Sequence, residues 1–172
     1  MTQMNSNKVK RTDESLRKVM ANLTAAAAQI KTTSIAGLIE CAVLVRRDME
    51  KADPKTPVDT GNLRHSFFIT TVKGNTTSSG SFKGENATEL EAEHQTTMAE
   101  ASAKVAGIKY PVLIMGYSAN YALWVHEAID AQFSGRAKKP KGRPGSGAKW
   151  FEFALNRNTP QMLTILGKEM KI

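Results

Sequence analysis

Residues 56–67, TPVDTGNLRHSF, bring a carboxylate, a hydroxyl and an imidazole together through Asp59, Thr60 and His65. These are the groups that nucleophilic catalysis uses, but a catalytic triad requires its members to converge on one point. Residues this close along a turn that enters a strand seldom converge. Aspartic proteases also use Asp-Thr-Gly, yet they pair two such carboxylates, and this chain has a single copy with no apolar strand immediately before it. We therefore expect no catalytic residues here and no enzymatic activity.

Turn chemistry explains the same stretch without a reaction. Pro57 disfavours a helical conformation at Thr56, Asp59 can accept backbone N–H groups in an Asx turn, and Gly61 can adopt a positive φ. The sequence therefore predicts a hinge turn at Pro57, Asp59 and Gly61, between a long helix and a sheet.

Metal and cofactor sites are not expected either. The histidines His65, His94 and His126 are scattered along the chain, and the single cysteine, Cys41, lies in the apolar run IECAVLV, where it reads as a buried small hydrophobe. The sequence contains no GxxxxGK[ST], GxGxxG or HExxH pattern. We expect no metal and no cofactor.

The composition indicates one folded domain with an anionic partner. The chain has 172 residues, of which 41% are hydrophobic and 23% charged, and its net charge is +8. That charge favours nucleic acid or the acidic face of another protein. Residues 1–12 are polar and predict a flexible tail. No apolar run approaches the roughly 20 residues that span a bilayer, so we expect no membrane partner and assembly in a reducing cytoplasm.

Apolar residues spaced by three and four positions predict helices at both ends of the chain. The first helix starts at Asp13, is interrupted by the β-branched KTTS at 31–34 and then continues, so a bent helix or a helical hairpin is expected. Near the C-terminus, residues 148–158 predict one helix, and Thr159 and Pro160 look like the N-cap and first position of another.

Two stretches rich in β-branched, aromatic or aliphatic residues, 67–73 and 110–117, predict strands that pair antiparallel. Between them, residues 74–107 predict a loop and a helix inserted into the hairpin. The expected fold class is α+β: one domain over 13–172, with a small antiparallel sheet and C-terminal helices packed on it. The expected core residues are Leu38, Val43, Phe68, Ile69, Val112, Ile114, Trp124, Phe151 and Leu155. Tyr121 and Trp124 fit either the core or an interface, and the core is favoured for both.

Two segments concentrate opposite charges. The insertion carries an acidic group, and residues 131–147 form a Gly/Pro-rich loop with a basic group. Each segment can be an ordinary solvent-exposed charged surface, and the alternative is that each is a docking face for a partner. The candidate interface residues are Glu85, Glu89, Glu91 and Glu93 in the acidic group, and Arg136, Lys138, Lys139, Lys141 and Arg143 in the basic group.

The order of these features resembles the tailed-phage neck and tail-completion family of small head–tail joining proteins. Three segments carry the resemblance: the turn at 56–66, the segment Tyr121–Glu127 that follows the second strand, and the aromatic-rich Trp150–Leu155. The sequence departs from the family in its long insertion and in Ala128, which begins a segment where the family commonly has glycine-threonine.

The resemblance implies a non-enzymatic virion structural protein. Such a subunit would form a homo-oligomeric ring, a hexamer or dodecamer, as a head–tail connector or tail terminator in the phage neck. Its partners would be the portal–connector and tail-tube proteins, with non-specific contact to DNA in the lumen. The alternative, supported by the net charge, is a basic nucleic-acid-binding module that acts outside the neck.

Overall fold

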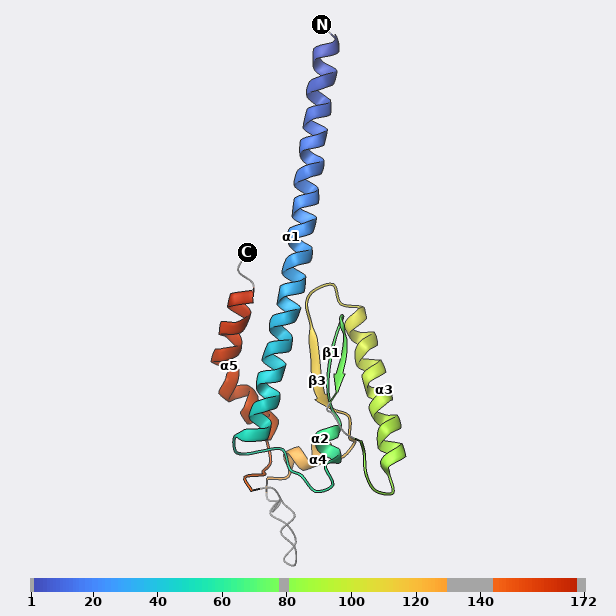
Figure 1. Cartoon of the computed structure of the whole chain (residues 1–172), viewed down its shortest axis with the longest axis vertical. Coiled ribbons are helices and arrows are strands. Elements are labelled where there is room, and N and C mark those ends of the chain that lie inside the picture. The colour runs from blue at the N-terminus through green and yellow to red at the C-terminus, as the bar shows by residue number, and fades with distance from the viewer. Residues whose placement is uncertain (1, 78–80, 130–143, 170–172) are drawn as a thin grey trace, which may run out of the picture.

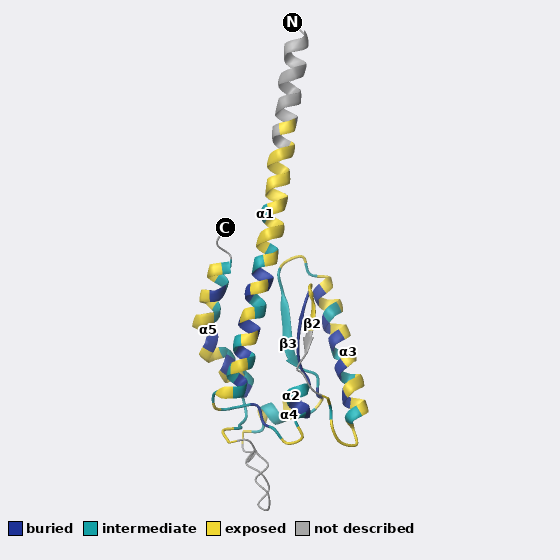
Figure 2. Cartoon of the chain, in the orientation of Figure 1, coloured by how far each residue is buried: buried dark blue, intermediate teal, exposed yellow. Residues whose placement is uncertain are grey.

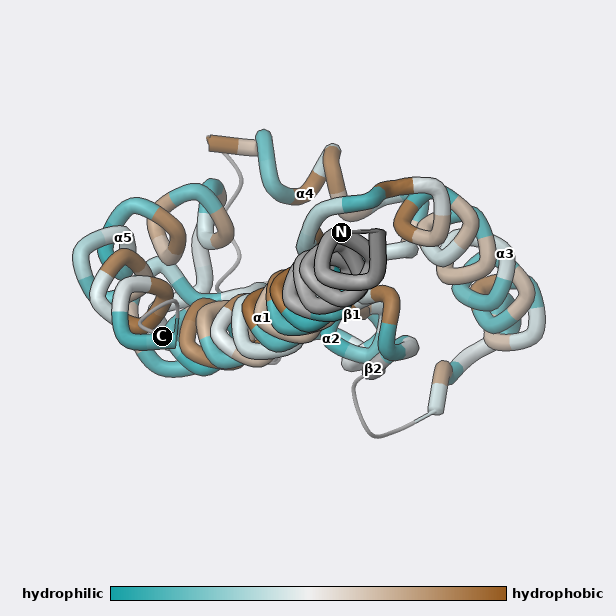
Figure 3. The backbone as a smooth tube through the Cα atoms, turned by 90° about the horizontal axis from the view of Figure 1, so that it is seen from above, coloured by the Kyte–Doolittle hydropathy of each residue, from teal (hydrophilic) through white to brown (hydrophobic). Residues whose placement is uncertain are grey.

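The computed structural model describes residues 2–77, 81–129 and 144–169 as an α+β fold, which confirms the predicted class (Figure 1). The long helix α1 (Thr2–Lys51) passes through the middle of the molecule and extends far beyond it. α3 and α5 lie on opposite sides of α1 and the sheet, as the view from above also shows (Figure 3). The short helices α2 (Asn62–His65) and α4 (Ala122–Glu127) lie at the end opposite the N-terminus.

α1 is continuous, so the predicted interruption at KTTS is wrong. The Thr33 hydroxyl hydrogen-bonds to the carbonyl groups of Gln29 and Ile30 at 3.2 and 3.1 Å, which lets a β-branched polar residue stay in the helix. The helix begins at Thr2, whereas the sequence predicted a flexible tail over 1–12 and a helix from Asp13. Its end at Lys51 agrees with the prolines that follow.

The sheet has the strand order β2-β1-β3, and β1 (Phe67–Thr71) is buried along its whole length. β3 (Leu113–Tyr117) pairs antiparallel with β1, from Phe67 opposite Tyr117 to Thr71 opposite Leu113, as predicted. β2 (Gly74–Thr77) was expected to be loop, but it closes a tight hairpin onto β1. An edge strand that faces solvent needs no apolar residues, so the polar sequence GNTT gave no strand signal.

α3 (Ala87–Ala106) is the predicted inserted helix, and it covers the sheet with one face (Figure 2). Its buried residues recur every three or four positions, as expected for a helix packed on a sheet. They are Leu90, His94, Met98, Ala101 and Val105.

α5 (Trp150–Glu169) is a single helix that contains Pro160, so the predicted division at Thr159 is wrong. The Thr159 hydroxyl donates to the carbonyl of Leu155 at 2.9 Å and does not cap a new helix. Trp150 and Phe151 in the first turn contact the ring of Tyr117 on β3, and the rest of α5 lies along α1.

The core lies where α1, the sheet and the start of α5 meet. Val45, Met49, Trp150 and Ala154 are fully buried there. Among the predicted core residues, Phe68 and Ile69 are buried, and Leu38, Val112, Ile114, Phe151 and Leu155 are half-buried. Val43 and Trp124 are exposed at 45% and 72%, so those two predictions are wrong.

Within the described part of the chain, one segment passes a length and hydropathy test for a membrane-spanning helix, contrary to the sequence expectation. It is Arg17–Lys51 of α1, and a third of its most apolar window is buried inside the molecule. Core helices of globular proteins pass the same test.

Candidate assembly surfaces

The turn at residues 56–66 joins α1 to β1 and is fixed at both ends. Thr56 is fully buried, and its N–H and hydroxyl both lie within hydrogen-bonding distance of the Met49 carbonyl, at 2.9 and 3.3 Å. The same hydroxyl is 3.2 Å from the Tyr117 hydroxyl on β3. The predicted hinge is therefore a fixed joint whose geometry sets the angle between helix and sheet.

Gly61 has φ 92°, which confirms the predicted left-handed residue, and Pro57 is buried. Asp59 is exposed, and the side chain that accepts a backbone N–H is its neighbour Thr60, 3.4 Å from the Asn62 nitrogen. Asn62 in turn bonds both the N–H and the carbonyl of Lys83, at 2.9 and 2.8 Å. The turn thereby also anchors the segment that precedes α3.

Replacing Gly61 by alanine should lower the free energy of unfolding by about 1–2 kcal/mol, because an L residue at positive φ is strained. Gly167 in α5 is the matched control: a Cβ there meets nothing within 4 Å. Alanine at Gly167 should stabilise the protein by about 0.4–1 kcal/mol. Urea unfolding of both variants tests this, and an equal effect of the two substitutions would contradict the assigned role of Gly61.

A charged cluster holds the turn against α1. Arg64 donates to Glu50 through Nε at 3.1 Å, and its Nη2 lies 2.8 Å from the other carboxylate oxygen. Arg46 lies 3.6 Å from the same carboxylate, donates to the Arg64 carbonyl at 3.1 Å and stacks 4.3 Å above the centre of the Phe67 ring. Glu50 thus ties α1 to the turn, and Arg46 extends the cluster to the start of β1.

The acidic group of the insertion is only partly available to a partner. Glu85, Glu89 and Glu91 are exposed, whereas Glu93 is half-buried and accepts a hydrogen bond from Asn120 at 3.0 Å. The basic residues Arg136, Lys138, Lys139, Lys141 and Arg143 lie outside the described residues.

The end of the basic loop is anchored close to the end of α1. The Lys55 nitrogen donates to the Gly145 carbonyl at 2.7 Å, and the Gly147 nitrogen donates to the Lys55 carbonyl at 3.2 Å. Gly145 has φ 80°, and a Cβ there would lie 2.0 Å from an Asp53 oxygen. The loop therefore leaves the body beside the joint between α1 and the sheet.

α4 and the residues that follow it present apolar side chains on the surface, including Trp124, for which the sequence favoured the core over an interface. Leu123 and Trp124 are each 72% exposed and Ile129 is 73% exposed. Leu123 and Trp124 line an open groove together with Asn120, Glu127 and Ala128. Beside it, hydrogen bonds from Lys149 and His126 lower the pKa of the Glu127 carboxyl, which stays ionised at the rim.

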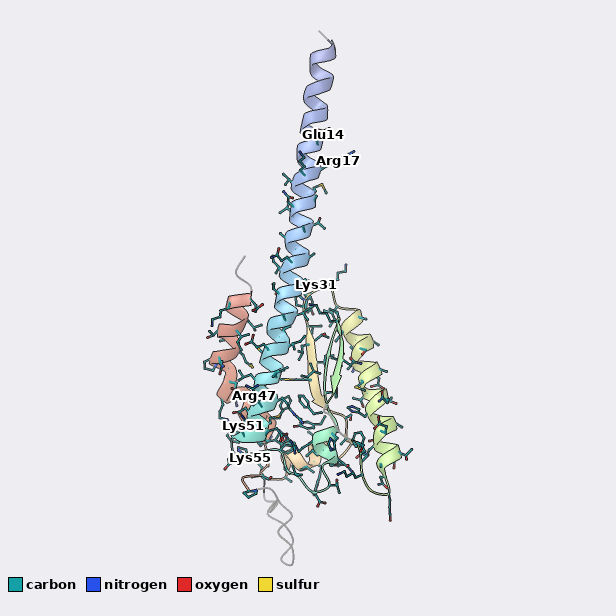
Figure 4. All side chains as sticks on the ribbon, in the orientation of Figure 1. Glu14, Arg17, Lys31, Arg47, Lys51 and Lys55 are labelled. Atoms are coloured by element: carbon teal, nitrogen blue, oxygen red, sulfur yellow. The ribbon has the colours of Figure 1, made fainter. Side chains whose placement is uncertain are left out.

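A second exposed apolar surface lies on the projecting half of α1 (Figure 2). Val19, Met20 and Leu23 are 53%, 67% and 65% exposed. Charged side chains are spaced along the helix, with Glu14 and Arg17 towards the free end and Lys51 near the C-terminal end (Figure 4).

His94 is a buried polar residue on the face of α3 that packs on the sheet. Its Nδ1 lies 2.7 Å from the Ser118 hydroxyl, and its ring packs edge-on against Phe68 and Phe82. Burial lowers the pKa of His94 below its ordinary value of 6.5, while the Glu91 carboxylate acts in the opposite direction. His94 therefore belongs to the packing of α3, and its neutral form fits the fold.

This pKa predicts a loss of stability in mild acid. The unfolded chain protonates His94 more readily than the native one, so its contribution is complete above pH 6.5 and is lost as the pH falls through the lowered native pKa. The slope from one group is at most about 1.4 kcal/mol per pH unit. Urea midpoints measured from about pH 8 to about pH 5 should fall less steeply in His94→Gln. Parallel pH profiles of the two proteins would contradict the prediction.

Among the described residues, no group of three or more His, Cys, Asp and Glu side chains is placed to hold a metal ion. Comparison with known proteins gives no match, whether to a family model, to a curated protein or to a solved structure.

Proposed function

We propose that the protein is a structural subunit of a tailed-phage neck, where it forms a homo-oligomeric ring between the portal–connector and the tail tube. The proposal rests on the resemblance of residues 56–66, Tyr121–Glu127 and Trp150–Leu155 to the head–tail joining family. The ring would be a hexamer or dodecamer in the virion, with DNA passing through its lumen.

The exposed groove on α4 is the observation that carries the proposal. It lies in the Tyr121–Glu127 segment, one of those that carry the resemblance, and Leu123 and Trp124 in it are each 72% exposed. Tryptophan is enriched among the residues that dominate binding energy at interfaces. A buried Trp124 would have pointed to the core, whereas an exposed one favours a docking role.

A ring subunit also needs two different surfaces that complement each other, because cyclic contacts run head to tail. The exposed Glu85, Glu89 and Glu91 offer a negative surface at the start of α3, and the basic group of the 131–147 loop offers the opposite charge. We propose that these two groups meet between neighbouring subunits.

Charge reversal tests this pairing. Glu89→Lys with Glu91→Lys should weaken ring assembly, and Lys138→Glu with Lys139→Glu should do the same. Combining all four changes should restore assembly at least in part, as measured by light scattering at low salt. A combined variant that assembles no better than either pair would refute the pairing and leave the ring itself untouched.

The ring is tested by the particle mass of the purified protein, alone and mixed with virion assemblies that lack their necks. Light scattering and electron microscopy should show a ring, formed alone or on the capsid or tail end. A stable monomer that ignores both assemblies and binds DNA without sequence preference would favour the nucleic-acid-binding module.

A further inference from the structure

Residues 17–30 of α1 are left largely uncovered by the rest of the described chain. Residues 17–30 project beyond the sheet, α3 and α5, and all of them except Ala26 are exposed (Figures 1 and 2). An isolated helix of this length is marginal in water, because most helical stability in proteins comes from packing one face. A second molecule is needed to cover this segment.

The apolar residues of this segment have the spacing of a coiled coil. Val19, Leu23, Ala26 and Ile30 follow one another at intervals of four, three and four residues. This repeat of 3.5 residues places these side chains in one line along the helix, the seam, which faces a partner helix over successive turns. The occupant that fits such a seam is therefore another helix.

The flanks of the seam show which helix fits. Met20 and Ala27 border it on one edge, and Asn22 and Gln29 border it on the other, so neither edge carries a charge. A partner helix selected by charge would use ionic pairs at these edges, and this segment offers none. Identical copies, by contrast, meet there without like-charge repulsion.

The width and direction of the contact follow from the same residues. Met20 is 67% exposed and lies beside the seam, so the apolar face is wider than a two-helix contact covers. Copies related by rotation about one axis keep their helices pointing the same way. Both features favour a parallel bundle of several copies.

We propose that residues 17–30 of α1 pack in parallel against the same residues of neighbouring copies of this chain and form a barrel of helices around the lumen of the ring. The proposal deepens the proposed function, since the ring supplies the axis and the number of copies. Arg17, Lys18 and Lys31 then lie outside the seam.

Disulfide trapping tests the contact and its direction. With an added oxidant, Val19→Cys should form an intermolecular disulfide, because parallel in-register copies bring this position next to itself. Ala21→Cys lies on the opposite side of the helix and is the matched control. Native Cys41 is buried and stays in both variants. Equal cross-linking of the two variants, or none in either, would overturn the proposal.

Charge insertion tests whether the seam holds the copies together. Val19→Glu with Leu23→Glu should reduce the particle mass from that of the wild-type oligomer towards the monomer. Ala21→Glu with Ala28→Glu adds the same charge on the outer side and should leave the mass unchanged. All four side chains are exposed in the free chain, so folding of the body does not depend on them.

The outcomes separate this proposal from the proposed function. If both glutamate variants keep the wild-type ring, the seam contact is refuted while the neck assignment stands. If the wild-type protein stays monomeric alone and with neckless virion assemblies, the neck assignment fails as well. Flotation of the wild-type protein with phosphatidylcholine–phosphatidylglycerol vesicles, lost in Val19→Glu with Leu23→Glu, would assign the seam to a lipid surface and overturn the proposal.

Discussion

Replacing Trp150 by alanine should lower the free energy of unfolding by about 3–5 kcal/mol, the largest effect expected for any single substitution considered for this chain. Trp150 is fully buried where α5 meets the sheet and α1. Its indole N–H donates to the Tyr117 hydroxyl at 3.2 Å. Its ring packs edge-on against the rings of Tyr117 and His126, with distances of 5.9 and 4.9 Å between ring centroids. Alanine would remove these contacts and leave a cavity.

Urea or guanidinium unfolding, followed by far-UV circular dichroism, measures this effect. Trp124→Ala is the matched control, because the chain has only two tryptophans and Trp124 is 72% exposed. Its free energy of unfolding should stay within about 0.5 kcal/mol of the wild type. Similar losses in the two variants would show that the core is not organised around Trp150.

The same pair of variants separates stability from assembly. If the α4 groove is an interface, Trp124→Ala should leave the fold intact and reduce the fraction of protein that enters rings. Trp150→Ala should affect assembly only through loss of folded protein. Trp150 is thus expected to stabilise the fold of the subunit, and Trp124 to stabilise the contact between subunits.

Sequence patterns predicted best the elements that a residue type marks directly. The strands 67–73 and 110–117 and their pairing followed from β-branched and aromatic residues, and the left-handed turn followed from Gly61. β2 was missed because it is an edge strand of polar residues and glycine. The interruption at KTTS was predicted from propensity, which the side-chain hydrogen bond of Thr33 overrides.

The candidate surfaces show a second limit of prediction from the sequence. Sequence periodicity identifies an apolar stripe but does not say whether the chain itself covers it. The stripe over Val19 and Leu23 was read in the same way as the one over Ile35 and Met49, yet only the second is buried. Trp124 fitted either the core or an interface by sequence and the core was favoured, yet its side chain is 72% exposed. Only the three-dimensional arrangement shows which apolar faces remain for a partner.

Replacing Glu50 by glutamine should be the next most damaging change, with a loss of about 1–3 kcal/mol in the free energy of unfolding. The side chain of Glu50 is 16% exposed, and its carboxylate lies 2.8 Å from Arg64 and 3.6 Å from Arg46. Glutamine keeps the shape but removes the negative charge between two guanidinium groups. Their mutual repulsion would then loosen the turn from α1.

Urea unfolding at low and high salt measures this loss, with Glu40→Gln as the control on the same helix. Glu40 is exposed, so its replacement should change stability by less than about 0.5 kcal/mol. Added salt should reduce the difference in free energy of unfolding between wild type and Glu50→Gln only in part, because a half-buried cluster is screened less than surface charges. A Glu50→Gln variant as stable as Glu40→Gln would mean that Thr56, through its bonds to Met49 and Tyr117, holds the joint without the charged cluster.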